Sequence, residues 1–390
     1  MSDTRAIVAL LGDLIPYREC PPFWVSVPER AGTFLASLRE AGRRAIGVSA
    51  GGREILAVEY GEKEPLQTAT DNLQSALASG EGGGSGVDPT RIFPPAFYGA
   101  KRRRRPVVVL QGALHGSELT GTVASLNLCR VIETGQDLRG KAWPRLRELA
   151  RETRLLIIPW LNPDGASRCP LHNPSDAPAD LYGAVNGGIR KDGAVLAYPE
   201  FKKRFPTPPE EMAFMGCTFN DRGVNLMYDF CTVERQPETQ AWMRYYLDER
   251  PDGVVIWHCN AGSLIGPPEG WLPEGHQHEL SRLGGAVRQR LLREGIRIGR
   301  LSWAGLVGMG RPTLNQANAV YHVSGAMPIL CELPAGIRPA VYSCDEMLDI
   351  GLLVIEEILL YAHRDGLRPY ELWDKVKPRT GATDERSPGA

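Results

Sequence analysis

The stretch Val107–Glu118 reads VVVLQGALHGSE and joins a run of apolar residues to two side chains that can bind a metal ion. A continuous apolar run such as 107–110 is typical of a strand covered on both faces of a parallel sheet. His115 and Glu118 follow the carboxyl end of this predicted strand. Ligands of open α/β sheets collect at that edge. The stretch therefore predicts a buried strand that leads into a functional loop.

Similar apolar runs alternate with amphipathic stretches along the rest of the chain. Further strands are predicted at 55–60, 155–158, 254–257 and up to residue 331, and helices at 31–40, 119–132, 279–294 and 348–363. Buried strands that alternate with helices indicate a sheet covered by helices on both faces. We therefore expect an α/β three-layer sandwich.

No linker clearly divides the chain, so we expect a single domain over residues 1–375. Residues 1–45 are predicted to form a helical lead-in. Residues 62–104 are predicted to be an insertion that contains a flexible, Gly-rich loop, EGGGSG. Residues 376–390 are polar, and we expect them to form a frayed tail.

Composition excludes several classes of protein. The 390 residues include 45 Lys and Arg and 46 Asp and Glu, a net charge of −1, which argues against a nucleic-acid binder. The basic run KRRRR at 101–105 is then interpreted as a solvated loop. No apolar run approaches the roughly 18 residues of a membrane helix, and the N-terminus lacks the cleavage site of a secretory signal. The eight cysteines form no CxxC pair, so we expect reduced, buried thiols in a cytoplasmic protein.

A second histidine and a second carboxylate follow other predicted strands. His258 follows the run VVIW, and Glu332 follows the strand that ends at residue 331. Two imidazoles and one carboxylate are a usual ligand set of a catalytic zinc ion, with water as the fourth ligand. An acid directly after an apolar strand is costly without a partner, and acting as a general base beside an activated water is such a use. Taken singly, each of these residues could equally be structural.

The ordered motifs resemble the zinc carboxypeptidases of the carboxypeptidase A type, a group that includes succinylglutamate desuccinylases and aspartoacylases. The matching pieces are GALHGSE at 112–118, NPDG at 162–165, GVNL at 223–226, PET at 237–239, His258 and Glu332-Leu333. The resemblance covers about residues 45–365.

This resemblance implies a mixed, mostly parallel, eight-stranded twisted sheet between helices, with one zinc ion. By carry-over, His115, Glu118 and His258 are the metal ligands and Glu332 is the catalytic base. Arg190, in the stretch GGIRK, is the match for the arginine that polarises the scissile carbonyl. Such an arginine would stabilise developing oxyanion charge.

The chain departs from the family where the substrate's carboxylate is bound. The family typically reads GVDLNRNF, whereas residues 223–230 read GVNLMYDF. Met227 and Tyr228 replace the Asn-Arg pair that clamps a terminal carboxylate, and a bidentate arginine contact is lost with it. Asn225 replaces an aspartate that supports a zinc-ligating histidine. The remaining candidates for substrate binding are Tyr228, Arg311 and Tyr321.

These observations leave three functions open. The first is a zinc-dependent hydrolase that cleaves a peptide or amide bond, of carboxypeptidase type, with altered recognition of the substrate's carboxylate. The second is a zinc deacylase or amidase that acts on small N-acyl amino acids or modified peptides. The third is a non-catalytic binding protein that retains the fold. Neither a membrane nor a nucleic acid is expected as a partner, and the oligomeric state stays open.

Two competing motifs are interpreted as structural. Ser49 lies in a GxSxG pattern at 47–51, but the helix that a nucleophile elbow requires does not follow it. The stretch HQHE at 276–279 could bind a metal, but it begins a predicted helix after a Gly- and Pro-rich loop. We expect it to form a solvated face.

Overall fold

The computed structural model describes residues 20–65, 103–203, 205–260, 265, 272, 274–296, 315–364 and 366–367. The N-terminal half of the lead-in, most of the 62–104 insertion and the C-terminal tail lie outside these ranges. The domain limits given above therefore stay a prediction.

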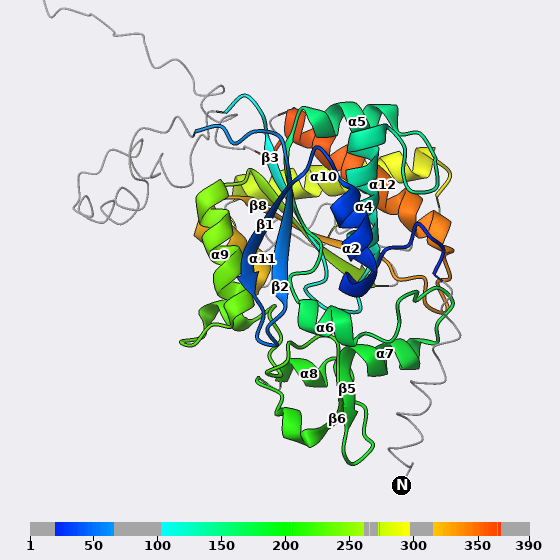
Figure 1. The fold of residues 1–390 in the computed structure, drawn as a ribbon, viewed down its shortest axis with the longest axis vertical. Helices are drawn as coiled ribbons and strands as arrows, with labels where there is room; N and C mark the ends of the chain where they lie inside the picture. The colour runs from blue at the N-terminus through cyan, green and yellow to red at the C-terminus, as the bar shows by residue number, and fades with distance from the viewer. Residues whose placement is uncertain are drawn as a thin grey trace, which may run out of the picture.

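A six-stranded sheet forms the centre of the described structure (Figure 1). In spatial order its strands are β1 (Gly42–Val48), β2 (Glu54–Tyr60), β4 (Arg154–Ile158), β3 (Val107–Gln111), β7 (Gly253–Asn260) and β8 (Met327–Pro334). The pairs β1–β2 and β2–β4 are antiparallel, and the pairs β3–β4, β3–β7 and β7–β8 are parallel. The sheet is thus mixed and mostly parallel, as expected. The strands β5 (Gly188–Arg190) and β6 (Met212–Met215) form a separate antiparallel pair.

Helices cover both faces of the sheet, which confirms the three-layer α/β sandwich (Figure 1). One face carries α4 (Thr120–Thr134), α5 (Pro144–Arg151), α10 (Glu274–Arg293) and α12 (Cys344–His363), and the other carries α9 (Pro237–Glu249) and α11 (Gln316–Ser324). The remaining helices are α2 (Pro28–Ser37), α6 (Pro163–Arg168), α7 (Ala179–Gly187) and α8 (Glu200–Lys203), with short 3-10 turns at Pro209–Glu211 and Asp229–Cys231. The helix predicted at 31–40 is therefore α2, which starts three residues earlier because Pro28 suits the first helical turn.

Successive side chains of β7 point to opposite faces of the sheet and so belong to different parts of the core. Val255 and Trp257 belong to the core under α4 and α12, whereas Val254 and Ile256 belong to the core under α9. The helix α4 approaches Trp257 closely, since a Cβ on Gly121 would lie 2.2 Å from the indole ring. With period-two alternation, His258 falls on the side of Val254 and Ile256.

The described residues give the main sheet six strands, two fewer than the eight expected. Ile265 nevertheless forms an antiparallel bridge with Cys331, on the edge of β8 that β7 does not occupy. The stretches around it, 261–264 and 266–271, and the stretch 297–314 lie outside the described residues. Within the part of the chain that the structure describes, no helix is long and apolar enough to span a membrane.

Three expectations about individual residues were wrong. Arg103, in the basic run, is not solvated: only 2% of its side chain is exposed, and it donates to the carbonyls of Glu249 and Arg250 and pairs with Asp252. It thereby satisfies carbonyls at the end of α9, which no helical N–H can reach. All eight cysteines are free thiols, but Cys20 is only half-buried and Cys231 is exposed.

Candidate metal centre

The loop after β3 brings His115 to the carboxyl edge of the sheet. The backbone of this loop packs directly against the backbone at Gly165 and Cys217. The Gly116 N–H donates to the Cys217 carbonyl at 2.8 Å. A Cβ on Gly116 would lie 2.1 Å from the carbonyl carbon of Gly165, so only glycine fits there. Asn162 accepts from the Gly165 N–H and donates to the carbonyl of Leu114. The NPDG motif therefore packs directly against the His115 loop and supports it.

His258 reaches the same place from the neighbouring strand. It lies inside β7 and not just after it, because the strand runs on to Asn260. Glu332 likewise lies inside β8, and the two residues pair in register. Residues in register on parallel strands project to the same side of the sheet, with the strands about 4.8 Å apart. The strands were expected to end too early because a polar residue, His258 in β7 and Glu332 in β8, interrupts each apolar run before the strand ends.

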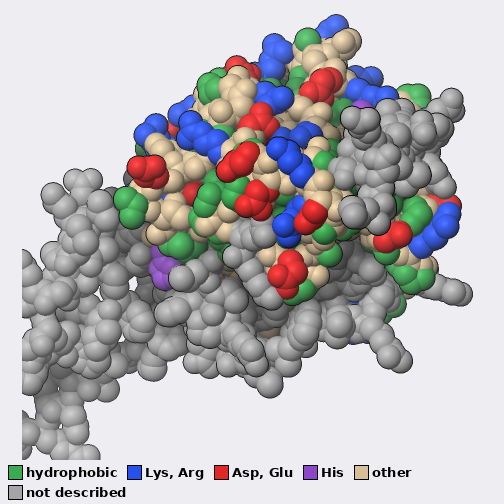
Figure 2. Space-filling model, turned by 90° about the horizontal axis from the view of Figure 1, so that it is seen from below, with side chains coloured by type: hydrophobic (Ala, Val, Ile, Leu, Met, Phe, Trp, Pro, Cys, Tyr) green, Lys and Arg blue, Asp and Glu red, His purple; other side chains and the backbone are tan. Residues whose placement is uncertain are grey.

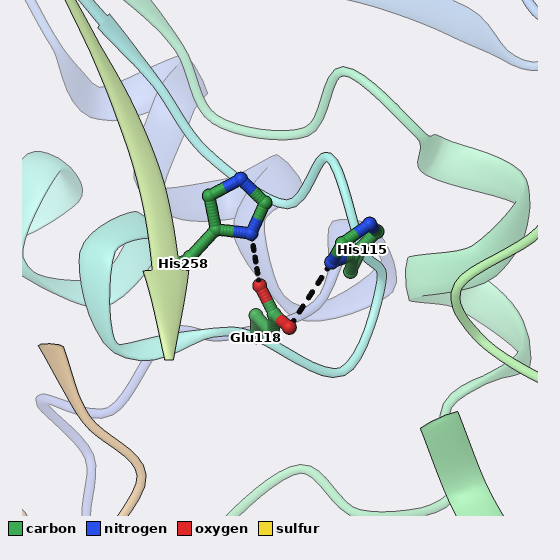
Figure 3. A group of neighbouring side chains, drawn as sticks. All are labelled: His115, Glu118 and His258. Atoms are coloured by element: carbon green, nitrogen blue, oxygen red, sulfur yellow. Dashed lines mark hydrogen bonds and ion pairs between the residues drawn. The ribbon is translucent and has the colours of Figure 1, made fainter. Parts of the chain in front are cut away.

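The Glu118 carboxylate lies between the two imidazoles (Figure 3). One carboxylate oxygen is 3.0 Å from Nδ1 of His115, and the other is 2.7 Å from Nδ1 of His258. The ring centroids of the two histidines are 4.8 Å apart. The side chains of His115, Glu118 and His258 are 13%, 11% and 5% exposed. The structure thus brings together the three residues expected as metal ligands.

The electrostatics of this group keep the carboxylate charged. Burial raises the pKa of Glu118, but the charges of the two imidazoles and their hydrogen bonds to the carboxylate outweigh it and lower the pKa to about 2. Two nitrogen donors and a charged oxygen form a ligand set that zinc favours. Their ligand atoms lie within 4.8 Å of one another, the only such trio of His, Cys, Asp or Glu among the described residues. The residues present therefore fit a divalent metal ion.

Sequence reasoning missed a polar network at the NPDG motif, which packs against the His115 loop. Asp164, of the NPDG motif, is fully buried and accepts from the Ser49 hydroxyl at 2.6 Å and from the Gly51 N–H at 2.9 Å. Arg53 pairs with both Asp164 and Asp221. Ser49 thus holds a loop to a buried carboxylate, in agreement with its structural interpretation. Asp164 is the charged residue of the NPDG motif, and its presence in this turn was the signal that could have indicated the network.

The other candidate residues are placed as follows. Arg190 ends β5 and pairs with Asp192 at 3.2 Å, in the lobe below the sheet edge (Figure 1). Tyr228 is half-buried against the core under α9. Tyr321, on α11, is 5% exposed, and its ring packs edge-on against His276. Arg311 lies outside the described residues. The roles of these four residues in catalysis and substrate binding stay predictions.

The stretch HQHE does not form a solvated face. His276, Gln277 and Glu279 are buried, and of the four only His278 is exposed. The reason is that α10 begins at Glu274, so this stretch lies in its first turns and packs against α11 and α12.

The surface seen from below, where much of the view is not described, shows mixed charges over the described residues and no large area of one sign (Figure 2).

Comparison with known proteins agrees with this geometry. Residues 42–171 match the sequence model of the zinc carboxypeptidases, a stretch that contains His115 and Glu118. No protein with a curated description matches the chain in sequence.

Solved structures share the fold at low sequence identity. A metallo-carboxypeptidase from Burkholderia cenocepacia has a TM-score of 0.51 and 13% identity, over 87% of this chain and 69% of that one. A metallo-carboxypeptidase from Pseudomonas aeruginosa, in complex with (2-guanidinoethylmercapto)succinic acid, has a TM-score of 0.52 and 14% identity, over 87% and 70%. Carboxypeptidase A from Helicoverpa armigera has a TM-score of 0.51 and 14% identity, over 96% and 83%. The chain therefore has the zinc carboxypeptidase fold, and its resemblance to that family of metal-dependent hydrolases is confirmed.

Proposed function

We propose that this protein is a zinc-dependent hydrolase that cleaves a peptide or amide bond, with one ion held by His115, Glu118 and His258. The observation that carries the proposal is the convergence of two imidazole Nδ1 atoms on one charged, buried carboxylate. A divalent ion would replace the protons that these groups share in the metal-free protein. When bound, the ion would polarise the scissile carbonyl and lower the pKa of a water molecule.

Glu332 is the general base in this proposal. Its register with His258 supports the assignment, because both side chains then project from the same side of adjacent strands. The Glu332 carboxylate accepts a proton from the attacking water. It then donates this proton to the leaving nitrogen as the C–N bond breaks. Arg190 is proposed to stabilise the negative charge that develops on the carbonyl oxygen.

The substrate is proposed to be recognised without the family's carboxylate clamp. Met227 is 8% exposed and packs in the apolar core with Leu226, so it offers no hydrogen bond to a substrate. Two arginines, Arg53 and Arg168, are already engaged, since Arg53 pairs with Asp164 and Arg168 pairs with Asp221. The missing Asn-Arg pair supports a second candidate, a deacylase or amidase that acts on N-acyl amino acids or modified peptides, beside the carboxypeptidase-type hydrolase.

Metal analysis and a matched substrate series test the proposal. We expect the purified chain to hold one zinc ion per molecule and to lose turnover on treatment with a chelator. We expect hydrolysis of a peptide and of its C-terminal amide at rates within tenfold of each other. A strict need for the free carboxylate would exclude the deacylase version. A protein that binds no zinc and ignores the chelator would instead support the binding-protein alternative.

A further inference from the structure

We infer that Asn186 is a positioning residue whose hydrogen bond with Ser117 ties the lobe that carries Arg190 to the metal-binding loop after β3. The lobe consists of α7, β5 and β6, and it lies below the edge of the main sheet (Figure 1). The inference deepens the proposed function and rests on it. Asn186 touches no reacting atom in this assignment and acts only by placing Arg190.

Both residues between the two ligands of the metal-binding loop are held from the side of the lobe. Ser117 is 1% exposed, and its hydroxyl donates to Oδ1 of Asn186, in the last turn of α7. The Gly116 N–H donates to the carbonyl of Cys217, which follows β6 closely in the chain. The path of this loop between its two ligands is therefore fixed by contacts with the lobe.

The backbone of Asn186 is held by the same part of the chain. Its carbonyl oxygen accepts from the Thr218 N–H at 3.1 Å. A Cβ on Gly216 would lie 2.2 Å from this carbonyl oxygen, so the two backbones are in direct contact. Asn186 thus contacts the segment after β6 through its main chain and the metal-binding loop through its side chain.

Arg190 follows Asn186 by four residues, and backbone hydrogen bonds hold the chain between them. The strand β5 pairs with β6 from Gly188 to Arg190. On the other side, the Arg190 N–H donates to the Ala194 carbonyl at 2.9 Å. The backbone position of Arg190 therefore follows that of Asn186. Since a group that stabilises an oxyanion acts only at the correct distance, the contact between Asn186 and Ser117 sets where Arg190 stands relative to the ligands.

Two alanine variants remove this hydrogen bond from its two ends. We expect Asn186→Ala and Ser117→Ala each to keep zinc and to lower kcat by about 10- to 100-fold, because an error of about 1 Å in the position of a catalytic group has an effect of this size. The double variant is expected to lose no more than either single one, since all three lack the same contact. Asn186→Asp keeps an oxygen that accepts from the Ser117 hydroxyl, and its kcat is expected to stay within about threefold of the wild type.

The Arg190→Ala background shows which group Asn186 acts through. In this background, Asn186→Ala is expected to cause no further loss of kcat. A second readout needs neither metal nor substrate. Hydrogen–deuterium exchange of the metal-free chain is expected to become faster over residues 186–190 in both alanine variants. The matched control is Ser324→Ala, which removes a buried hydroxyl whose hydrogen bonds join it to Val320 and Ala326. This control is expected to change neither kcat nor the exchange of residues 186–190.

The possible outcomes separate the inference from the proposed function. Unchanged kcat and unchanged exchange in both alanine variants would overturn the inference while leaving the proposed function intact. An equal loss of kcat with and without the Arg190 side chain would overturn the action through Arg190. A wild-type chain that binds no zinc and hydrolyses neither test substrate would overturn both. Should one alanine variant fail to fold, the other decides, because both remove the same hydrogen bond.

Discussion

His258 on β7 and Glu332 on β8 occupy paired positions of two parallel strands. This register places an imidazole and a carboxylate side by side at the carboxyl edge of the sheet. The same edge receives His115 and Glu118 from the loop after β3. Because hydrogen bonds between backbones fix the register, the spacing of the two side chains does not depend on a flexible loop.

Glu332→Gln is expected to keep zinc and lose turnover. The amide has nearly the same shape as the carboxylate but cannot accept a proton from water, and removing a general base lowers kcat by about 10²- to 10⁴-fold. Zinc content and kcat measured on the same preparation check this. Full activity in Glu332→Gln would remove the base assignment, whereas loss of zinc would mean that Glu332 is a metal ligand instead.

Much of the fold was predictable because burial leaves a strong mark on the sequence. The runs that predict β3 and β4 are apolar throughout, since both strands are covered on both faces. The ends of β7 and β8 were missed for the opposite reason. His258 and Glu332 are polar residues inside these strands, so each continuous apolar run stops before the backbone pairing does.

The support around the site was beyond sequence reasoning for a different reason. The contact of Ser49 with Asp164 joins residues 115 positions apart, and the sequence around each residue does not indicate which residue it contacts. The burial of Arg103 follows from the position of the last turn of α9, which only the tertiary structure gives. Propensity and periodicity describe single elements, whereas these contacts depend on how elements meet.

Gly116→Ala is expected to weaken zinc binding and lower stability together. The new Cβ would lie 2.1 Å from backbone atoms of Gly165, so the His115 loop must shift. Overpacking of this kind lowers the free energy of unfolding by about 1–3 kcal/mol. Gly183→Ala, in α7, is the matched control, because a Cβ there meets nothing within 4 Å. Equal zinc affinity in the two variants would contradict the role given to the loop.

Ser49→Ala is expected to lower stability without lowering kcat. The Ser49 hydroxyl donates to the buried Asp164 carboxylate, and a hydrogen bond to a charged group contributes about 1.5–3 kcal/mol. Urea denaturation measures this loss. Turnover of the folded fraction is expected to match the wild type, since Ser49 is assigned no chemical step. A loss of kcat by several orders of magnitude, with zinc retained, would revive the serine-nucleophile interpretation.

Because of the buried carboxyl of Glu238, the free energy of unfolding is expected to decrease as the pH rises above the ordinary pKa of a glutamate. Glu238 is fully buried at the start of α9, where burial raises its pKa and the nearby Asp164 charge adds to the increase. Hydrogen bonds from the Ala50 N–H and the Asn220 amide act in the opposite direction but do not cancel it. The native protein therefore holds this proton to a higher pH than the unfolded chain does.

The sign of the effect follows from this difference in proton binding. Where the native state binds more protons than the unfolded state, the free energy of unfolding falls as the pH rises. The Glu238 contribution is complete below the ordinary glutamate pKa and is lost as the pH passes through the raised one. Urea denaturation at closely spaced pH values measures the slope, and Glu238→Gln is expected to flatten it. Glu152→Gln, at the exposed end of α5, removes a carboxylate from the surface and is the matched control. If Glu238→Gln keeps the full slope of the wild type, another group is responsible for it.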